Sequence, residues 1–173
     1  MPDFDVRLRS ADCLADLLFI LVEPFGPMPI KLSVSPRTVL LCDYGMGGFV
    51  PPEMVKRRPV VIVSPRLPHR DGLCTVVPLS GTPPLHAVPY VVKVDLPEPL
   101  PDPFGERTFW AKCDMVGTVA FGRLDLFQTK RGHDGRRRYL HPKLPQDAFA
   151  EVRRGVLFAL GLGHLTITTP GTH

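Results

Sequence analysis

Residues 51–64 read PPEMVKRRPVVIVS, a stretch in which three cations lead into an apolar, β-branched run. Pro59 has no backbone N–H and a fixed φ, so it suits the first position of a strand. The apolar, β-branched run that follows is typical of a strand buried on both faces. Lys56, Arg57 and Arg58 lead directly into this strand. The sequence therefore predicts positive charge at the start of the strand, where the backbone is rigid. A solvated loop is the alternative for three consecutive cations.

Strand-like runs alternate with turn-like segments on both sides of this stretch. The runs predicted as the first four strands are 38–44, 59–64, 73–79 and 88–96. Asp71-Gly72 precedes the third run and is a strong hairpin signal, which favours antiparallel pairing. Two further runs are supplied by FWAKCDMVGTV at 109–119 and FGRLDLF at 121–127. Five or six short antiparallel strands indicate a small, strongly curved sheet that is closed or nearly closed.

The last part of the chain predicts one helix. Pro145 suits its first turn, and Asp147 lies near the positive end of the helix dipole. Four apolar residues recur at helical spacing, namely Phe149, Val152, Val156 and Leu160. Gly161 is placed to end the helix. We therefore predict an α+β fold of mainly antiparallel β structure, in which this core-facing helix covers the curved sheet.

Composition and charge suit a single globular domain. A chain of 173 residues with 44% hydrophobic and 22% charged residues is long enough for one domain with a real core. The net charge of +4 is mild, yet a second basic cluster, KRGHDGRRR at 130–138, concentrates it. Such clusters suit phosphate, because neutralising the backbone dominates affinity for nucleic acid. A hairpin tip that its charges keep soluble is the alternative.

The four cysteines are far apart and form no CxxC pair, so the sequence predicts no zinc site. Three of them, Cys42, Cys74 and Cys113, lie inside apolar strand-like runs, where a free thiol acts as a small buried hydrophobe. The apolar run CLADLLFILV near the start is shorter than the about 20 residues that span a bilayer, and no secretory signal fits it. We therefore expect a protein of the reducing cytoplasm that has no membrane segment.

Three motifs follow one another in a telling order. The first is an acid, Glu53, that lies five residues before Arg58-Pro59 and the strand that begins there. The second is VVPLS at 76–80, and the third is AKCDMVGTVAFGRL at 111–124. Together they resemble the PemK/MazF family of toxin ribonucleases, and the resemblance runs from Thr38 to Leu162. It implies a small SH3-like plug barrel of the CcdB/MazF type. It also implies a homodimer whose RNA groove crosses the dimer interface.

The resemblance further implies the toxin of a type II toxin-antitoxin pair. Such a protein cleaves single-stranded RNA sequence-selectively, without a metal or other cofactor, and leaves 2′,3′-cyclic phosphate and 5′-hydroxyl ends. Its partner would be an antitoxin with an acidic, disordered tail, since that tail must compete with RNA phosphates for the basic groove. Two alternatives stay open: a CcdB-like inhibitor that binds gyrase, and a catalytically silent member of the family that only binds RNA.

Metal-free cleavage of RNA requires a base for the 2′-hydroxyl, a stabilised phosphorane and a proton for the leaving oxygen. Arg58 fits the second task, because a guanidinium grips two phosphate oxygens with paired donors. Ser80 can donate to the phosphate where the family usually has threonine, and a serine that only satisfies a turn is the alternative. Glu53 is the candidate base, with a surface ion partner of an arginine as the alternative. The expected RNA contacts are Lys56, Arg57, Arg131, Arg136, Arg137 and Asp114.

The motif at 111–124 matches the family at two positions and departs from it at one. Asp114 matches an acidic position of the family, whereas Met115 replaces the glutamine usually found beside it. Arg123 matches a family arginine that we expect to be structural or dimer-forming. Trp110 and Phe109 precede the motif and are able to stack a base, although a pair of aromatic residues in a strand is more often part of a core.

The chain divides into three parts by this reasoning. Residues 1–36 are an expected N-terminal extension, residues 37–165 the single PemK/MazF-like domain, and residues 166–173 an expected disordered tail. The extension holds either a short packed helix or a mis-assigned start, with Met28 as the biological first residue. Recovery of peptides from the first 27 residues, in mass spectrometry of the natively expressed protein, would contradict a start at Met28.

Overall fold

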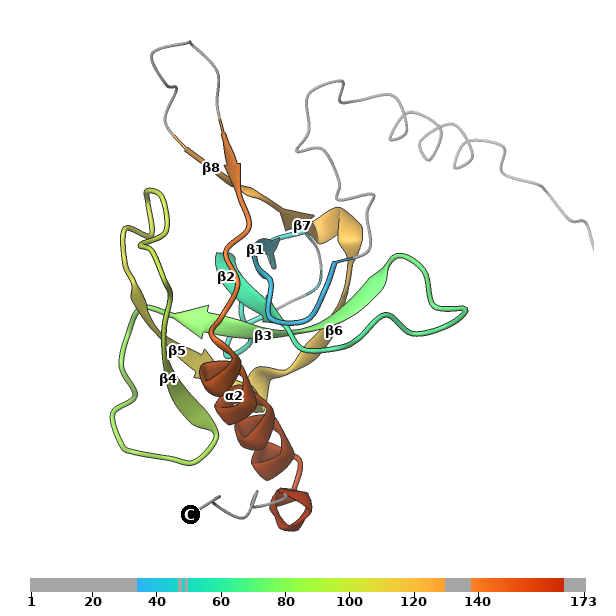
Figure 1. Cartoon of the computed structure of the whole chain (residues 1–173), viewed down its shortest axis with the longest axis vertical. Coiled ribbons are helices and arrows are strands. Elements are labelled where there is room, and N and C mark those ends of the chain that lie inside the picture. The colour runs from blue at the N-terminus through green and yellow to red at the C-terminus, as the bar shows by residue number, and fades with distance from the viewer. Residues whose placement is uncertain (1–33, 47, 49, 130–137, 167–173) are drawn as a thin grey trace, which may run out of the picture.

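The computed structural model describes residues 34–46, 48, 50–129 and 138–166 (Figure 1). Most of the expected N-terminal extension, the chain beyond Thr166 and the basic residues 130–137 lie outside this part, so what we expect of them stays a prediction. Within it, a curved antiparallel sheet and one α-helix dominate (Figure 1).

The elements follow one another as short segments. The strands are β1 Val39–Asp43, β2 Arg57–Ile62, β3 Leu73–Ser80, β4 Val91–Asp95, β5 Thr108–Lys112, β6 Gly117–Ala120, β7 Leu124–Asp125, β8 Phe127–Gln128 and β9 Tyr139–Leu140. The 3₁₀ helices are η1 Cys113–Met115, η2 Phe121–Arg123 and η3 Gly163–Leu165, and the α-helix is α2 Gln146–Ala159.

Six strands form one path through the sheet, in the order β4-β5-β3-β2-β1-β7, and β6 pairs with β3 beside this path. Each of these pairings is antiparallel. The end strands β4 and β7 do not pair with each other in the described part, so the sheet is open. β8 and β9 form a separate hairpin that projects from the body of the domain (Figure 1). The predicted α+β class with a curved antiparallel sheet is confirmed.

The second strand begins two residues earlier than the sequence predicts. Arg57 and Arg58 are strand residues, paired with Asp43 and Cys42 of β1. Pro59 is therefore not the first residue of the strand, yet it lies where only β1 pairs with β2, because the ladder to β3 starts at Val60. A proline without an N–H is tolerated at such a half-paired position.

Strand β3 bends the sheet by changing partners along its length. Its first half pairs with β6 through Leu73 to Val76, and its last two residues, Leu79 and Ser80, pair with β5. Pro78 lies between these two ladders, at a position where only β2 pairs with β3. The missing N–H of this proline therefore falls where no second strand needs it.

Alternation along the strands divides the apolar residues between two faces. We call the first the α2 face, because Val61, Val77 and Leu79 share a buried cluster there with residues of α2. The opposite face carries Val60 and Val76 in a second buried cluster. Each strand near the centre of the sheet is thus buried on both sides, as the apolar run after Pro59 predicts.

Helix α2 covers the α2 face through part of its predicted apolar stripe. Phe149 and Val152 are buried and Val156 is half-buried, which confirms three of the four predicted positions. Leu160 is 58% exposed, so its predicted place in the core is wrong. The helix ends at Ala159, and Gly161 turns the chain away at a φ of +74°. None of the helices in the described ranges is long and apolar enough to cross a membrane.

Candidate active site

Three strands end close together at one edge of the sheet. Asp43, the last residue of β1, pairs with Arg57, the first residue of β2. The β2–β3 ladder pairs Val60 with Pro78, so its continuation by two residues brings Arg58 opposite Ser80, the last residue of β3. Because neighbouring residues of a strand point to opposite faces, Arg57 and Arg58 serve different faces of this edge.

Arg58 and Ser80 lie on the face opposite α2. Arg58 alternates with Val60, and Ser80 with Val76, and both valines belong to the buried cluster of that face. The Arg58 side chain is half-buried, and its Nε atom is buried with no hydrogen-bond partner. No ion pair joins it to a carboxylate of the described chain. The guanidinium therefore keeps its donors for a ligand in a setting that water screens poorly.

Ser80 takes part in a tight turn at the end of β3. Its Oγ accepts a hydrogen bond from the N–H of Thr82 at 3.1 Å and lies 3.4 Å from the carbonyl oxygen of the same residue. This is the turn-stabilising arrangement that the sequence leaves open as an alternative. The residue is half-buried, and the contact holds its hydroxyl at a fixed place beside the position of Arg58.

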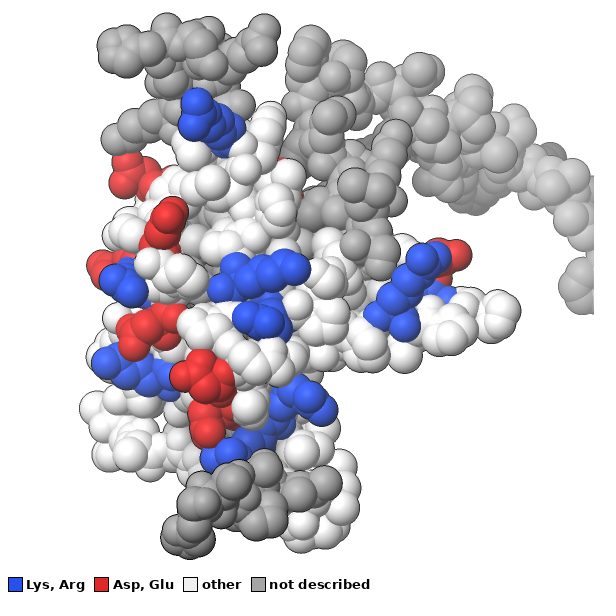
Figure 2. Space-filling model, viewed as in Figure 1, with Lys and Arg blue, Asp and Glu red and all other residues white. Residues whose placement is uncertain are grey.

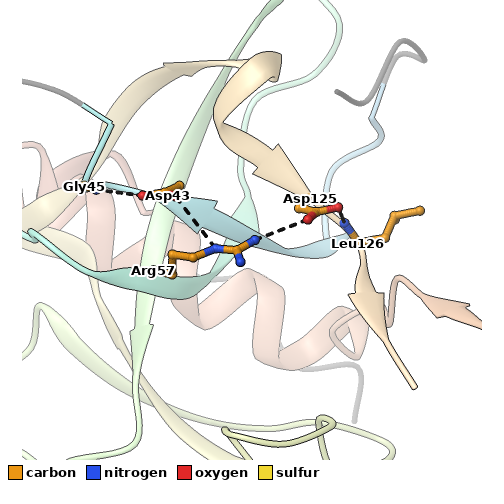
Figure 3. Close-up of polar contacts among 5 residues, drawn as sticks. All are labelled: Asp43, Gly45, Arg57, Asp125 and Leu126. Carbon is orange, nitrogen blue, oxygen red and sulfur yellow. Dashed lines mark hydrogen bonds and ion pairs between the residues drawn. The ribbon is translucent and has the colours of Figure 1, made fainter. Parts of the chain in front are cut away.

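Arg57 lies between two carboxylates, as Figure 3 shows, and its alternation with Val61 puts it on the α2 face. Its Nη2 donates to Oδ2 of Asp125 at 3.2 Å, and its Nε is 3.8 Å from Oδ2 of Asp43. The second oxygens of the two acids accept hydrogen bonds from the N–H groups of Gly45 and Leu126, at 2.8 Å each. This cluster ties together the ends of β1, β2 and β7. It gives Arg57 partners that an RNA phosphate would have to displace.

Glu53 and Lys56 lie in the loop between β1 and β2, at the same edge of the sheet. Oε2 of Glu53 accepts a hydrogen bond from the N–H of Val50 at 2.9 Å, and the side chain is exposed. No ion pair joins Glu53 to Arg58 in the described chain, so the surface pairing that the sequence offers as an alternative is absent there. Lys56 is exposed.

The remaining predicted contacts fall in other places. Asp114 lies in η1, after β5, and is exposed. Arg131, Arg136 and Arg137 lie outside the described residues. Sequence reasoning also missed Asp43 and Asp125 as partners of Arg57. The alternation of β1 points Asp43 to the α2 face, which is the signal that could have identified the first of them.

Three free thiols are buried in the two clusters, and one of them, Cys42, is the β1 partner of Arg58. Burial raises the pKa of Cys42 to about 11 and that of Cys74 to about 12, and the Arg123 guanidinium lowers the Cys42 value only in part. Cys113, under α2, likewise has a pKa raised by burial, to about 12. All three are buried and without a disulfide, as predicted. Neutral buried thiols are poor nucleophiles, so all three serve as packing groups of the core.

Charge on the visible surface is mixed. Figure 2 shows lysine and arginine side chains interspersed with acidic ones on the side in view, with no single basic field. A pocket of about 290 Å³ lies elsewhere, between residues 97–100 and residues 139–143, and none of the predicted site residues lines it. The side chains of Arg58 and Ser80, rather than a basic surface or a pocket, therefore identify the edge of the sheet as the candidate site.

Comparison with known sequences points to one family. The sequence model described as PemK-like, MazF-like toxin of type II toxin-antitoxin system matches residues 36–159. YifN of Escherichia coli K12 is 29% identical over 147 residues, which cover 75% of this chain and 93% of YifN. A protein of Haemophilus influenzae Rd is 29% identical over 137 residues, which cover 73% of this chain and 90% of that protein.

Solved structures share the same fold. An endoribonuclease from a mycobacterial species superposes with a TM-score of 0.51 at 19% identity, over 77% of this chain and 96% of that chain. A mycobacterial endoribonuclease in complex with its cognate antitoxin gives a TM-score of 0.51 at 21% identity, over 75% and 97% of the two chains. Since the family model spans most of the described domain, the chain belongs to the PemK-like and MazF-like toxins of type II toxin-antitoxin systems, as its three motifs predict.

Proposed function

We propose that this toxin is a metal-independent, sequence-selective endoribonuclease of single-stranded RNA that leaves 2′,3′-cyclic phosphate and 5′-hydroxyl ends. The observation that carries the proposal is the placement of Arg58 and Ser80 on one face, at the facing ends of β2 and β3. Membership of the toxin family supports it, as do the two mycobacterial proteins of like fold, which are endoribonucleases.

In the proposed reaction the 2′-oxygen of the substrate bonds to the adjacent phosphorus, and the bond from phosphorus to the 5′-oxygen breaks. Arg58 stabilises the negative charge on the non-bridging oxygens, and the Ser80 hydroxyl adds a second donor. Both come from strand ends, which hold catalytic groups more firmly than loops do. The proton of the 2′-hydroxyl passes to Glu53, and the leaving 5′-oxygen takes a proton from Arg58 or from water.

Glu53 is proposed as the base on its place in the loop that enters β2. One of its carboxylate oxygens is already used by the N–H of Val50, which fixes the orientation of the group and leaves its second oxygen for the 2′-hydroxyl. The side chain is exposed, so the substrate can reach this second oxygen, and a carboxylate is a usual proton acceptor in general base catalysis.

The partners follow from the same proposal. A cognate antitoxin with an acidic, disordered tail would cover the basic edge, a homodimer would extend the RNA groove across two subunits, and the pair would work in the cytoplasm. Lys56 and the basic residues 130–138 supply phosphate contacts in this scheme, and each such contact makes binding weaker as salt rises.

The test is to incubate the purified protein with a defined RNA in excess EDTA and to map the product ends. Arg58→Ala is run beside Arg57→Ala, which removes the same charge from the opposite face. We expect wild-type cleavage with cyclic phosphate ends, a loss on the order of a hundredfold or more in Arg58→Ala, and a loss below about tenfold in Arg57→Ala.

Four results would count against the proposal. Cleavage that EDTA abolishes would contradict a metal-independent reaction, and equal loss in the two arginine variants would remove the special role of Arg58. Intact RNA with tight binding would indicate a silent RNA-binding member of the family. Intact RNA without binding would favour the gyrase inhibitor, which a supercoiling assay then identifies.

A further inference from the structure

A row of polar and aromatic side chains crosses three strands beside the proposed site. Trp110 of β5 pairs with Ser80 of β3 on one side and with Lys93 of β4 on the other. Paired residues of an antiparallel ladder present their side chains on the same face. Lys93, Trp110 and Ser80 therefore lie in line on the face opposite α2, where the register also brings Arg58.

Trp110 is not part of either core. Its neighbours Phe109 and Ala111 are buried on the α2 face, whereas the indole packs against neither buried cluster of the domain. It is half-buried, and its N–H makes no hydrogen bond with another described residue. The core interpretation thus holds for Phe109 and fails for Trp110. A large aromatic ring that is left beside a reactive centre has the geometry of a stacking platform.

Positive charge flanks this ring. Lys93 is exposed directly opposite it, and Lys112 follows two residues further along β5 on the same face. Neither lysine forms an ion pair with a carboxylate in the described ranges. The one acid of β4 on this face, Asp95, accepts a hydrogen bond from the hydroxyl of Thr108. Strands in a sheet are about 4.8 Å apart, so Lys93 stands about 10 Å from Ser80.

We propose that Trp110 and Lys93 form a nucleotide subsite next to the scissile phosphate. The base of the adjoining nucleotide stacks on the indole, and Lys93 pairs with the phosphate beyond it. A stacked base and a neutralised phosphate are the two contacts that hold single-stranded RNA without depending on its sequence. The inference rests on the proposed function, because RNA is the ligand, but it concerns binding rather than cleavage.

Trp110 is the single tryptophan of the chain, so its fluorescence reports on the subsite directly. The ligand is a single-stranded oligoribonucleotide with 2′-O-methyl groups, which cannot be cleaved by 2′-hydroxyl attack. We expect saturable quenching of the tryptophan emission, at the same Kd that fluorescence anisotropy of a labelled oligonucleotide gives. Quenching by a stacked base requires contact with the ring, which mere proximity of the RNA does not supply.

Two variants and two matched controls test the residues. By anisotropy, Trp110→Leu should weaken binding about 5- to 100-fold, as expected for one lost base stack. Lys93→Gln should weaken it severalfold and lower the slope of log Kd against log salt by about 0.7, the value for one phosphate contact on a single strand. Phe158→Leu and Arg153→Gln likewise remove an aromatic ring and a positive charge, but from exposed positions of α2, and we expect both to stay within twofold of wild type.

The outcomes separate this inference from the proposed function. Cleavage by the wild type without quenching, and with normal binding in Trp110→Leu, would overturn the subsite and leave the nuclease standing. Quenching and weakened binding in Trp110→Leu, in a protein that does not cleave RNA, would support the subsite and overturn the nuclease. Equal effects in Trp110→Leu and Phe158→Leu, with a fall in thermal stability, would reassign Trp110 to folding and overturn the subsite.

Discussion

Two consecutive arginines at the start of β2 point to opposite faces of the sheet, and the two faces differ in the partners that they give to the arginine. On the α2 face, Arg57 is held between Asp43 and Asp125, whose second oxygens are bound to backbone N–H groups. On the other face, the buried Nε of Arg58 has no hydrogen-bond partner. The register brings Arg58 opposite Ser80 of β3, and Ser80 in turn pairs with Trp110 of β5. Of these two identical side chains, which are one residue apart, one is paired with two carboxylates and the other has a buried donor without a partner.

Strand alternation, rather than charge, assigns different roles to the two arginines. A run of three cations looks uniform in the sequence, and a loop would leave all of them equivalent. Because β2 begins at Arg57, the pleat directs one guanidinium to the ion pairs with Asp43 and Asp125 and the next to the face of the proposed site. The strand therefore sorts a basic cluster into a part that holds the edge together and a part that is free to bind a phosphate.

The largest effect should come from exchanging each arginine for lysine. Arg58→Lys keeps the charge but loses the paired donors, so we expect kcat to fall about a hundredfold. Arg57→Lys can still pair with Asp43 or Asp125, and its charge lies on the face opposite the proposed site, so its kcat should stay within about threefold. Steady-state cleavage of one RNA by the two variants measures the ratio. Similar losses in both would contradict the division of roles.

Overpacking the α2 face should lower stability while leaving the face of the proposed site intact. A Cβ on Gly155 of α2 would lie 2.7 Å from Sγ of Cys113 and 3.0 Å from Cγ2 of Val92. We expect Gly155→Ala to lower the free energy of unfolding by about 1–3 kcal/mol, measured by urea denaturation. Adding Cys113→Ala removes the nearer clash, so the double variant should lose less than the sum of the two single losses. Simple additivity would contradict the close approach.

A smaller effect of opposite sign should follow from weakening the ion pairs of Arg57. Asp125→Asn keeps an oxygen for the N–H of Leu126 but removes the charge that holds Nη2 of Arg57. The freed arginine then becomes available to RNA, and we expect the Kd of an uncleavable oligonucleotide to fall up to about fivefold, the range of one surface ion pair. Asp147→Asn on α2 makes the same change of net charge away from the site. Tighter binding in both variants would point to net charge alone.

Much of this arrangement is predictable from local sequence, and the rest depends on register. The apolar run after Pro59, the Asp71-Gly72 turn and the stripe of α2 are local patterns, and they yield the strands and the helix. The partners of Arg57 are not local, because Asp125 lies 68 residues away on β7. Trp110 meets Ser80 only because β3 pairs with β5 rather than with β4. No spacing in the sequence fixes that choice, so the sequence indicates that Trp110 is able to stack a base but does not place its ring beside Ser80.

The smallest expected effect concerns Cys42, the β1 partner of Arg58. Burial raises the pKa of this thiol from about 9 to about 11, so on alkalinisation the unfolded chain loses this proton before the folded chain does. The stabilisation from the buried neutral thiol is complete below pH 8 and is lost as pH rises through 9 towards 11. Between pH 8 and 9.5, the free energy of unfolding should fall less steeply in Cys42→Ala than in wild type, by less than about 1 kcal/mol.

Arg58→Ala serves as the control, because removing the neighbouring arginine should leave that slope unchanged if the shift comes from burial. Equal slopes in wild type and Cys42→Ala would mean that the thiol titrates alike in both states, and that the face beneath Arg58 is wetter than its packing indicates.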